Sequence, residues 1–171
     1  MKTRNIVYIG LLAALCFVAT YINIPLNLGG AKTMIHLGTT AIFISAVIIG
    51  PEAGFAGAIG CGLFDLLDPA YASYAIFTFI IKGLQGYSAG KIAFLGGKKG
   101  SSPIQNLLAF IVGAIVSLVG YFFVDWLVFY NLPVALQHTV TSIATSVIGI
   151  IFSLVVTSII KPITKKANIG I

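Results

Sequence analysis

One lysine, Lys82, lies in the middle of an apolar run that extends from Tyr71 to Gly90. A run of about 20 apolar residues is long enough to cross a bilayer as a helix. A charge at that depth costs about 2.5–3.5 kcal/mol on insertion scales, so it faces a protein interior or a polar cavity rather than lipid. Thr78 and Gln85 share the helix face of Lys82, because they lie four residues before it and three after it. We expect this face to line a small-molecule pocket.

The composition points to the membrane throughout the chain. Hydrophobic residues make up 58% and charged residues 8%, whereas soluble domains carry roughly 25% charged residues. The net charge of +6 does not indicate a nucleic-acid partner, because the cations lie at the ends of apolar runs without interleaved aromatic residues. The two cysteines, Cys16 and Cys61, lie inside apolar runs and are interpreted as small buried thiols.

Short polar or Gly- and Pro-containing breaks divide the chain into six apolar runs. The first follows Lys2 and Arg4, as in a signal peptide, but it continues to Ile24, so we interpret it as a retained span. The third is short and contains four glycines, which indicates close packing against neighbouring helices. The fold class predicted is an all-α integral membrane protein, a single domain over 1–171 with six transmembrane helices. They lie at about 5–26, 34–50, 53–67, 71–94, 103–130 and 135–160.

The cations predict the orientation of these helices. Two of the ten cations fall elsewhere, Lys32 on the opposite face and Lys82 within a span. Because cytoplasmic loops carry the excess of Lys and Arg, both termini are expected in the cytoplasm. The loops 27–33, 68–71 and 130–136 then face outward. The other eight lie on the face shared by the termini and the loop after the fourth span: Lys2, Arg4, Lys91, Lys98, Lys99, Lys161, Lys165 and Lys166.

Lys82 has two interpretations, which are compatible. It contacts a ligand, or it pairs with Asp65 and joins the third and fourth spans. Asp65 lies one helical turn inside the outer end of the third span, whereas Asp68 precedes Pro69 and is a turn residue.

A second polar stripe follows His138 in the sixth span. Thr141 and Thr145 lie three and seven residues further on, at a depth comparable with that of Lys82. Hydroxyls in membrane helices also bond their own backbone, which is the alternative. The aromatic segment around Asp125 is either an interfacial belt or a place where Trp126, Tyr121 or Phe122 stacks on a flat ligand.

The sequence contains no pattern typical of an enzyme or a metal site. Two histidines without a spaced carboxylate do not form a metal site. The chain has no HExxH, GxSxG or Walker A motif. We therefore predict no enzymatic activity, no metal and no cofactor.

The order of these features resembles the substrate-binding S components of energy-coupling factor (ECF) vitamin transporters, over nearly the whole chain. The resemblance is greatest to the riboflavin-transporter-like branch. The residues that carry it are a G-P-x-x-G turn at Gly50, Pro51 and Gly54, the aspartate Asp65 at the end of the third helix, and an F-T-x-I-I-K-G-x-x-G segment from Phe77 to Gly86.

The resemblance implies a subunit that binds a vitamin or precursor near the outer face and delivers it inward. The partners it implies are a membrane scaffold subunit, two cytoplasmic ATPase subunits and the lipid bilayer. The family's coupling motif on the first helix, A-x-x-x-A, is only partly matched by Gly10 and Ala14, which Val18 follows. The ligand residues implied are Asn27, Tyr74, Thr78, Lys82, Gln85, Trp126, His138, Thr141 and Thr145.

The types of these implied ligand residues guide the choice of ligand. Thiamine-type sites favour an acid for the cationic ring, and we expect no acid at mid-membrane depth. A lysine with hydroxyls and an aromatic ring suits a small neutral or weakly acidic heteroaromatic, so we favour hydroxymethylpyrimidine or pyridoxine. The alternatives are riboflavin or another vitamin, a stand-alone secondary carrier and, more remotely, a membrane enzyme or assembly factor.

Overall fold

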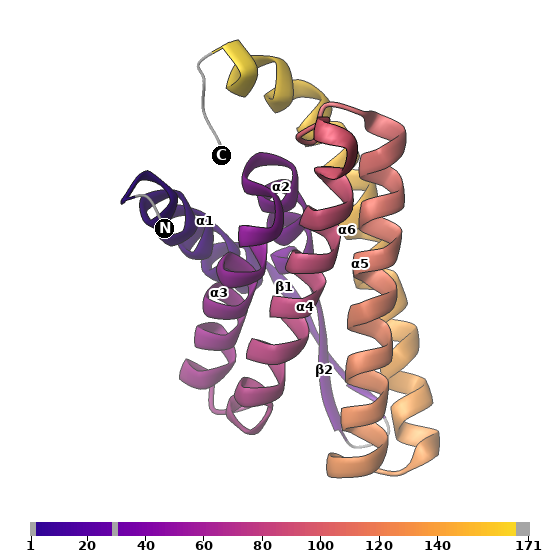
Figure 1. Cartoon of the computed structure of the whole chain (residues 1–171). Helices are drawn as coiled ribbons and strands as arrows, with labels where there is room; N and C mark the ends of the chain where they lie inside the picture. Colours follow the sequence, from indigo (N-terminus) through magenta and orange to yellow (C-terminus); the bar gives the residue numbers. More distant parts are fainter. Residues whose placement is uncertain (1–2, 29–30, 167–171) are drawn as a thin grey trace.

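Most of the chain is helical, and a β-hairpin interrupts the helices near the N-terminus (Figure 1). The computed structural model describes residues 3–28 and 31–166. Its elements are α1 Thr3–Tyr21, β1 Asn23–Leu28, β2 Ala31–His36, α2 Gly38–Ile49, α3 Ala53–Leu67, α4 Ala75–Ala93, α5 Pro103–Val124 and α6 Leu132–Lys166. Shorter helical segments are η1 Gly50–Glu52, η2 Ala72–Tyr74, η3 Leu95–Gly97 and the π-helical turn η4 Asp125–Phe129.

Within the described residues, four helical segments are long and apolar enough to cross a membrane. They are Thr3–Tyr21, Gly38–Leu67, Pro103–Phe129 and Leu132–Thr164. The predicted class, a mostly helical membrane protein, is confirmed. The number of six spans and the cytoplasmic termini stay predictions.

The β-hairpin corrects the all-α prediction. β1 and β2 pair antiparallel from Asn23 opposite His36 to Leu28 opposite Ala31. The first helix therefore ends at Tyr21 rather than near 26, and the second begins at Gly38 rather than 34. The expected loop 27–33 belongs largely to this hairpin, although Gly29 and Gly30 lie outside the described residues.

The hairpin has a local sequence signal for a strand, but Pro25 and the two glycines make it hard to recognise. Ile24, Leu26 and Leu28 alternate with other residues in β1, and this period of two is typical of a strand. Pro25, opposite Met34, cannot donate a backbone hydrogen bond. It is tolerated because each strand of a two-stranded sheet is an edge strand.

The last helix is longer than predicted at both ends. α6 runs from Leu132 to Lys166, whereas 135–160 was expected. Pro162 lies inside the helix instead of ending it. An interior proline removes one backbone hydrogen bond and crowds the carbonyl group four residues before it, yet α6 continues from Pro162 to Lys166.

Glycines allow α3 to approach both α1 and α4 closely. A Cβ atom built on Gly60 would lie 2.4 Å from the carbonyl oxygen of Ala13 in α1. A Cβ on Gly86 in α4 would lie 2.5 Å from the carbonyl oxygen of Ala53 in α3. The close packing predicted for the glycines of the third helix is therefore confirmed.

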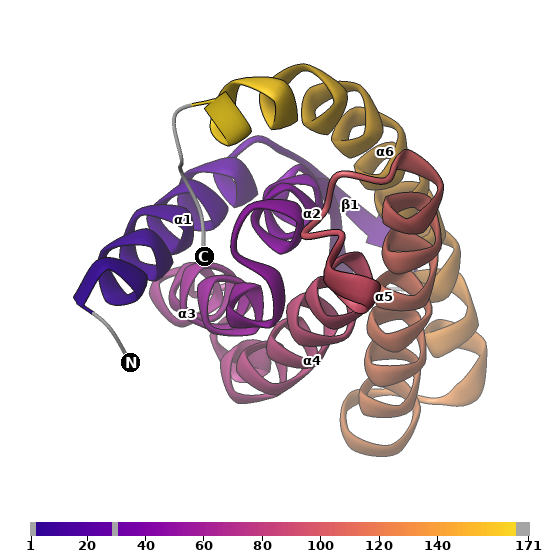
Figure 2. The ribbon, with the colours of Figure 1, turned by 45° about the horizontal axis from the view of Figure 1, so that its top comes forward.

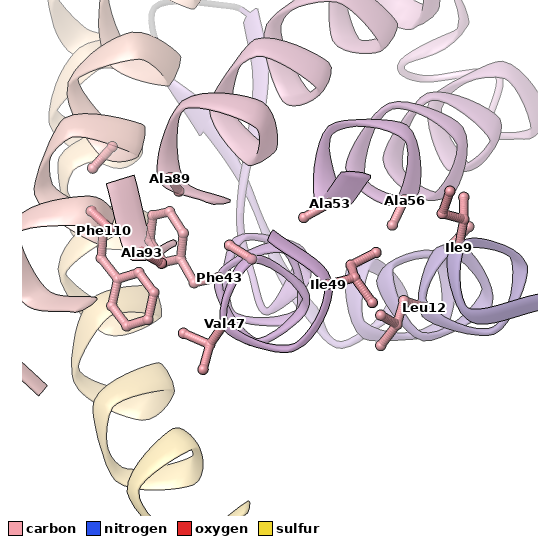
Figure 3. Close-up of a cluster of buried hydrophobic side chains, with 14 residues drawn as sticks. Ile9, Leu12, Phe43, Val47, Ile49, Ala53, Ala56, Ala89, Ala93 and Phe110 are labelled. Atoms are coloured by element: carbon pink, nitrogen blue, oxygen red, sulfur yellow. The ribbon is translucent and has the colours of Figure 1, made fainter. Parts of the chain in front are cut away.

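The apolar core is centred on α2. Seen with the top of Figure 1 turned forward, α2 lies between α1 on one side and α5 on the other (Figure 2). Phe43 stacks on Phe110 of α5 with 4.7 Å between ring centroids, and Ile49 belongs to the same buried cluster as Leu12 of α1 (Figure 3). A helix that is apolar on all sides is expected in such a central place.

Candidate ligand-binding site

The polar face of α4 points into the protein. Thr78, Lys82 and Gln85 are all buried, and Lys82 is only 3% exposed. Their spacing of four and three residues places them on one side of the helix. The opposite side of α4 carries exposed apolar residues such as Ile76, Ile80 and Leu84, which suits a lipid-facing surface. The orientation expected for the Lys82 face is thus observed.

Lys82 connects three helices through neutral groups. Its Nζ donates hydrogen bonds to Thr39 Oγ1 of α2 at 3.2 Å, to Gln85 Oε1 at 3.0 Å and to Ser117 Oγ of α5 at 3.3 Å. It also lies 5.4 Å from the centre of the Tyr121 ring. Among the described residues no salt bridge within 4 Å joins Lys82 to Asp65, so the pairing of these two residues stays a prediction.

Asp65 has a different partner, because it accepts a hydrogen bond from the Thr78 hydroxyl. The Tyr121 hydroxyl is 2.9 Å from Thr78 Oγ1. Since the Thr78 proton is directed to the carboxylate, Tyr121 is the donor to Thr78. This series of hydrogen bonds, from Tyr121 through Thr78 to Asp65, connects α5, α4 and α3 beside Lys82.

Asp125 forms a second polar cluster at the π-helical turn η4. It accepts a hydrogen bond from the Tyr74 hydroxyl, and His138 Nδ1 lies 3.2 Å from its Oδ2. A carboxylate only accepts, so Nδ1 carries the proton and His138 Nε2 is left for another partner. Within the described part of the chain this buried Nε2 has no hydrogen-bond partner.

These groups surround a cavity of about 90 Å³. A smaller cavity of about 40 Å³ adjoins it, since Met34, His36, Lys82, Tyr121 and Ser142 line both. The walls of the larger cavity are formed by Thr20, Lys32, Thr33, Met34, His36, Cys61, Asp65, Tyr71, Tyr74, Thr78, Lys82, Tyr121, Asp125, His138 and Ser142. Asp65 and Asp125 are thus cavity residues, although the ligand residues implied by the resemblance included no acid.

The β-hairpin forms one wall of the cavity. His36, at the end of β2, accepts a hydrogen bond at its Nδ1 from the backbone N–H of Gly38. Burial, and secondarily the charge of Lys82, lowers the pKa of His36 to about 3. The ring is therefore neutral, and its proton lies on Nε2. Burial, followed by the charges of Asp68 and Asp65, raises the pKa of Tyr71, so this phenol stays protonated.

The structure brings five of the nine predicted ligand residues to these cavities: Tyr74, Thr78, Lys82 and His138 line the larger one, and Thr145 lines the smaller one.

The other four lie elsewhere. Gln85 is buried behind Lys82 and binds it, and Thr141 is buried outside the two linings. Asn27 is exposed on β1. Trp126 is 39% exposed and packs against Phe122 and Phe123.

Several lining residues, among them Ser117 and Ser142, were not predicted from the sequence, and Tyr121 was considered only as a residue that stacks on a ligand. Ser117 and Tyr121 precede Asp125 by eight and four residues along α5. Ser142 follows His138 by four residues on α6. This spacing of one helical turn could have identified them, whereas nothing local indicates the contribution of the hairpin.

Comparison with known proteins shows which family the chain resembles. The chain is 27% identical to the thiamine precursor transporter HmpT of Lactococcus lactis subsp. cremoris (strain MG1363), in an alignment that covers 99% of this chain and 94% of the relative. It is also 34% identical over 119 residues to an uncharacterized protein of Pyrococcus woesei, "in gap 3'region", covering 68% of this chain and 75% of that protein. A family model for the S component of ECF-type riboflavin transporters matches residues 1–164. The chain therefore belongs to the family of ECF-type riboflavin transporter S components.

Proposed function

We propose that this chain is the substrate-binding subunit of an ECF-type importer for a single-ring vitamin or vitamin precursor, with hydroxymethylpyrimidine or pyridoxine as the ligand. The observation that carries the proposal is the polar cavity around Lys82, enclosed by helices whose outer surfaces are apolar. Buried ionisable groups in a membrane protein mark a functional site by default, because they are costly to keep there.

The size of the cavity favours a small ligand. It measures about 90 Å³, well below the roughly 300–1,000 Å³ of pockets for drug-sized molecules. A single six-membered ring with short substituents fits such a space better than the three fused rings and ribityl chain of riboflavin. The named Lactococcus relative, a thiamine precursor transporter, supports the same choice.

The polar groups of the cavity suit a ring that both donates and accepts hydrogen bonds. The three donors of the Lys82 ammonium bind neutral groups only, so an electron-rich ring nitrogen or oxygen of the ligand replaces one of these groups and accepts from the charge. Asp65 and Asp125 accept from a ring amino group or a hydroxymethyl group, and carboxylates bind such donors strongly. Hydroxymethylpyrimidine offers these groups, and pyridoxine offers a phenol oxygen, a ring nitrogen and hydroxymethyl groups.

The transport role adds three further parts to the proposal. Six helices cross the membrane with both termini in the cytoplasm, so the cavity opens toward the outside. A scaffold subunit binds the outer face of α1, where Gly10 and Ala14 are exposed. Two ATPase subunits supply the energy, since the chain has no Walker A motif of its own.

Calorimetry on the purified protein without ATP tests the ligand assignment. We expect one ligand per chain for hydroxymethylpyrimidine or pyridoxine, with riboflavin and thiamine binding more weakly because they exceed the cavity. Mass spectrometry of the molecule that co-purifies identifies the ligand independently. Heat from none of the B vitamins or their precursors, with no co-purified small molecule, would overturn the proposal.

A further inference from the structure

A third cavity, of about 400 Å³, is lined by residues at the beginning of α5 and near the end of α6. These two segments lie near the top of Figure 1. The third cavity shares no lining residue with the cavity around Lys82. Tyr121, near the end of α5, lines the cavity around Lys82, whereas Asn106, near the beginning of α5, lines the third cavity. The two residues are fifteen positions apart, which corresponds to about 22 Å along the helix. This cavity is thus a separate feature of the opposite end of the molecule.

The charge of this region is positive. Lys161 lines the cavity, and its Nζ donates one hydrogen bond, to the carbonyl oxygen of Val47 at 2.7 Å. An ammonium has three donors, so donors remain for an occupant. Lys98 and Lys99 are exposed in the segment that leads into α5, and none of the four acids of the chain lines the cavity.

The start of α5 adds unpaired donors. Ser102 at its N-cap makes no side-chain capping bond, and Pro103 follows it. The first N–H groups of a helix have no partner within the helix and attract anions.

A buried amide provides independent evidence of a missing partner. Asn106, another lining residue, is 4% exposed, and its Nδ2 donates to the carbonyl oxygen of Gly100 at 2.8 Å. Its Oδ1 accepts no hydrogen bond from any described residue. A buried polar atom without a partner is costly, so an occupant with a donor group completes this wall.

The surfaces beside the cavity are apolar and exposed. Ile104 and Leu108 on α5 are 76% and 55% exposed, and Val155 and Ile159 on α6 are 57% and 63% exposed. Such surfaces suit hydrocarbon chains in a bilayer. The cavity therefore combines cationic and hydrogen-bonding groups at one end with lipid-facing helices along its sides.

We propose that this cavity binds one anionic phospholipid, with the phosphate at Lys161 and the start of α5 and the acyl chains along the outer faces of α5 and α6. Basic pockets between membrane helices on the cytoplasmic side bind anionic headgroups in this way. A hydroxyl of a glycerol headgroup donates to Asn106 Oδ1, so phosphatidylglycerol is the suitable probe. The site does not depend on which vitamin the other cavity binds.

Native mass spectrometry on the full chain, exchanged into micelles with equal amounts of phosphatidylglycerol and phosphatidylcholine, tests the proposal. We expect wild-type protein to retain phosphatidylglycerol selectively. Lys161→Gln should reduce that retention about fivefold, the effect of one cation near a lipid surface. Lys91→Gln is the matched control, because it removes the same charge from an exposed residue of α4 outside the cavity, and it should change nothing.

A second pair of variants keeps the test decisive if Lys161→Gln unfolds. Ser158 is exposed and lines the cavity, so Ser158→Phe should block the lipid sterically, while Lys161→Arg should retain it. Equal retention of both lipids by the wild type, or equal losses in Lys91→Gln and Lys161→Gln, would overturn the proposal. Displacement of the lipid by inorganic phosphate alone would assign the cavity to a free anion instead. Vitamin binding measured on the same samples separates failure of this site from failure of the transport proposal.

Discussion

At the scale of single residues, the chemistry of the cavity depends on the positive charge of Lys82, whose hydrogen-bond acceptors are all neutral. The hydroxyls of Thr39 and Ser117 and the amide of Gln85 accept from its Nζ. These neutral groups solvate the charge without cancelling it. An ammonium has three donors, so a ligand atom with a lone pair would have to replace one of these acceptors. It would then accept a charge-assisted hydrogen bond, which is stronger than a bond between neutral groups.

The first prediction concerns a substitution that removes this charge. Lys82→Met keeps the length of the side chain and removes its donors. Since a hydrogen bond to a charged group contributes about 1.5–3 kcal/mol, vitamin affinity should fall roughly 10- to 100-fold. Calorimetry measures the change, and Lys91→Met, an exposed residue of the same helix, serves as the control. Unchanged affinity would leave Lys82 with only a structural role between α2, α4 and α5.

At the scale of elements, α1 has one buried face and one exposed face. Cys16 and Ala13 are buried against neighbouring helices. Gly10 and Ala14 are exposed, together with Val18 at 58%. Small residues four apart allow another helix to approach closely, so the exposed face is free for a partner.

The exposed face predicts the effect of Gly10→Leu. Nothing described lies within 4 Å of a Cβ at this position, so the variant should fold and bind the vitamin normally. The added side chain should prevent close approach of the scaffold subunit and reduce its co-purification. Ile104→Phe, on the exposed side of α5, is the control. Intact co-purification of Gly10→Leu would remove α1 as the coupling surface.

The buried face predicts a loss of stability for Gly60→Ala. Its Cβ would meet the carbonyl oxygen of Ala13 at 2.4 Å, so α1 and α3 must separate. Overpacking of this kind costs about 1–3 kcal/mol. Thermal unfolding in detergent should show a lower midpoint for Gly60→Ala than for the wild type. The midpoint of Gly10→Ala should be unchanged, because the space around this position is open. Equal midpoints for the two variants would contradict the close helix contact.

At the scale of the whole molecule, the distribution of cations predicts an inside and an outside. Lys98 and Lys99 are exposed at one end of the described chain, and Lys32 is exposed on the hairpin beside the cavity. The positive-inside rule predicts that the end with more cations lies in the cytoplasm. In this proposed orientation the cavity around Lys82 faces the outside of the cell.

Cysteine labelling in intact cells tests this orientation. The native thiols Cys16 and Cys61 are 0% and 1% exposed, so they should react little with a membrane-impermeant maleimide. Lys32→Cys should be labelled in intact cells, whereas Lys98→Cys should be labelled only after permeabilisation. The reverse pattern would invert the topology and the direction of capture.

Local chemistry allowed part of this structure to be predicted from the sequence. The bounds of α3, 53–67, were predicted correctly because Gly50-Pro51 and Asp68-Pro69 are breaks that act within a few residues. The inward face of α4 was also predictable, since a helical period relates Thr78, Lys82 and Gln85 without knowledge of any other helix.

The sequence alone determined the membrane location, the mostly helical class and the family, because these depend on composition, on the spacing of breaks and on motifs. Only the tertiary structure decided that Thr78 donates to Asp65, that Asp125 joins Tyr74 and His138, and that a β-hairpin lines the cavity. These contacts connect elements far apart in the chain. Their partners depend on the rotation and distance of packed helices, and no local pattern of residues specifies those.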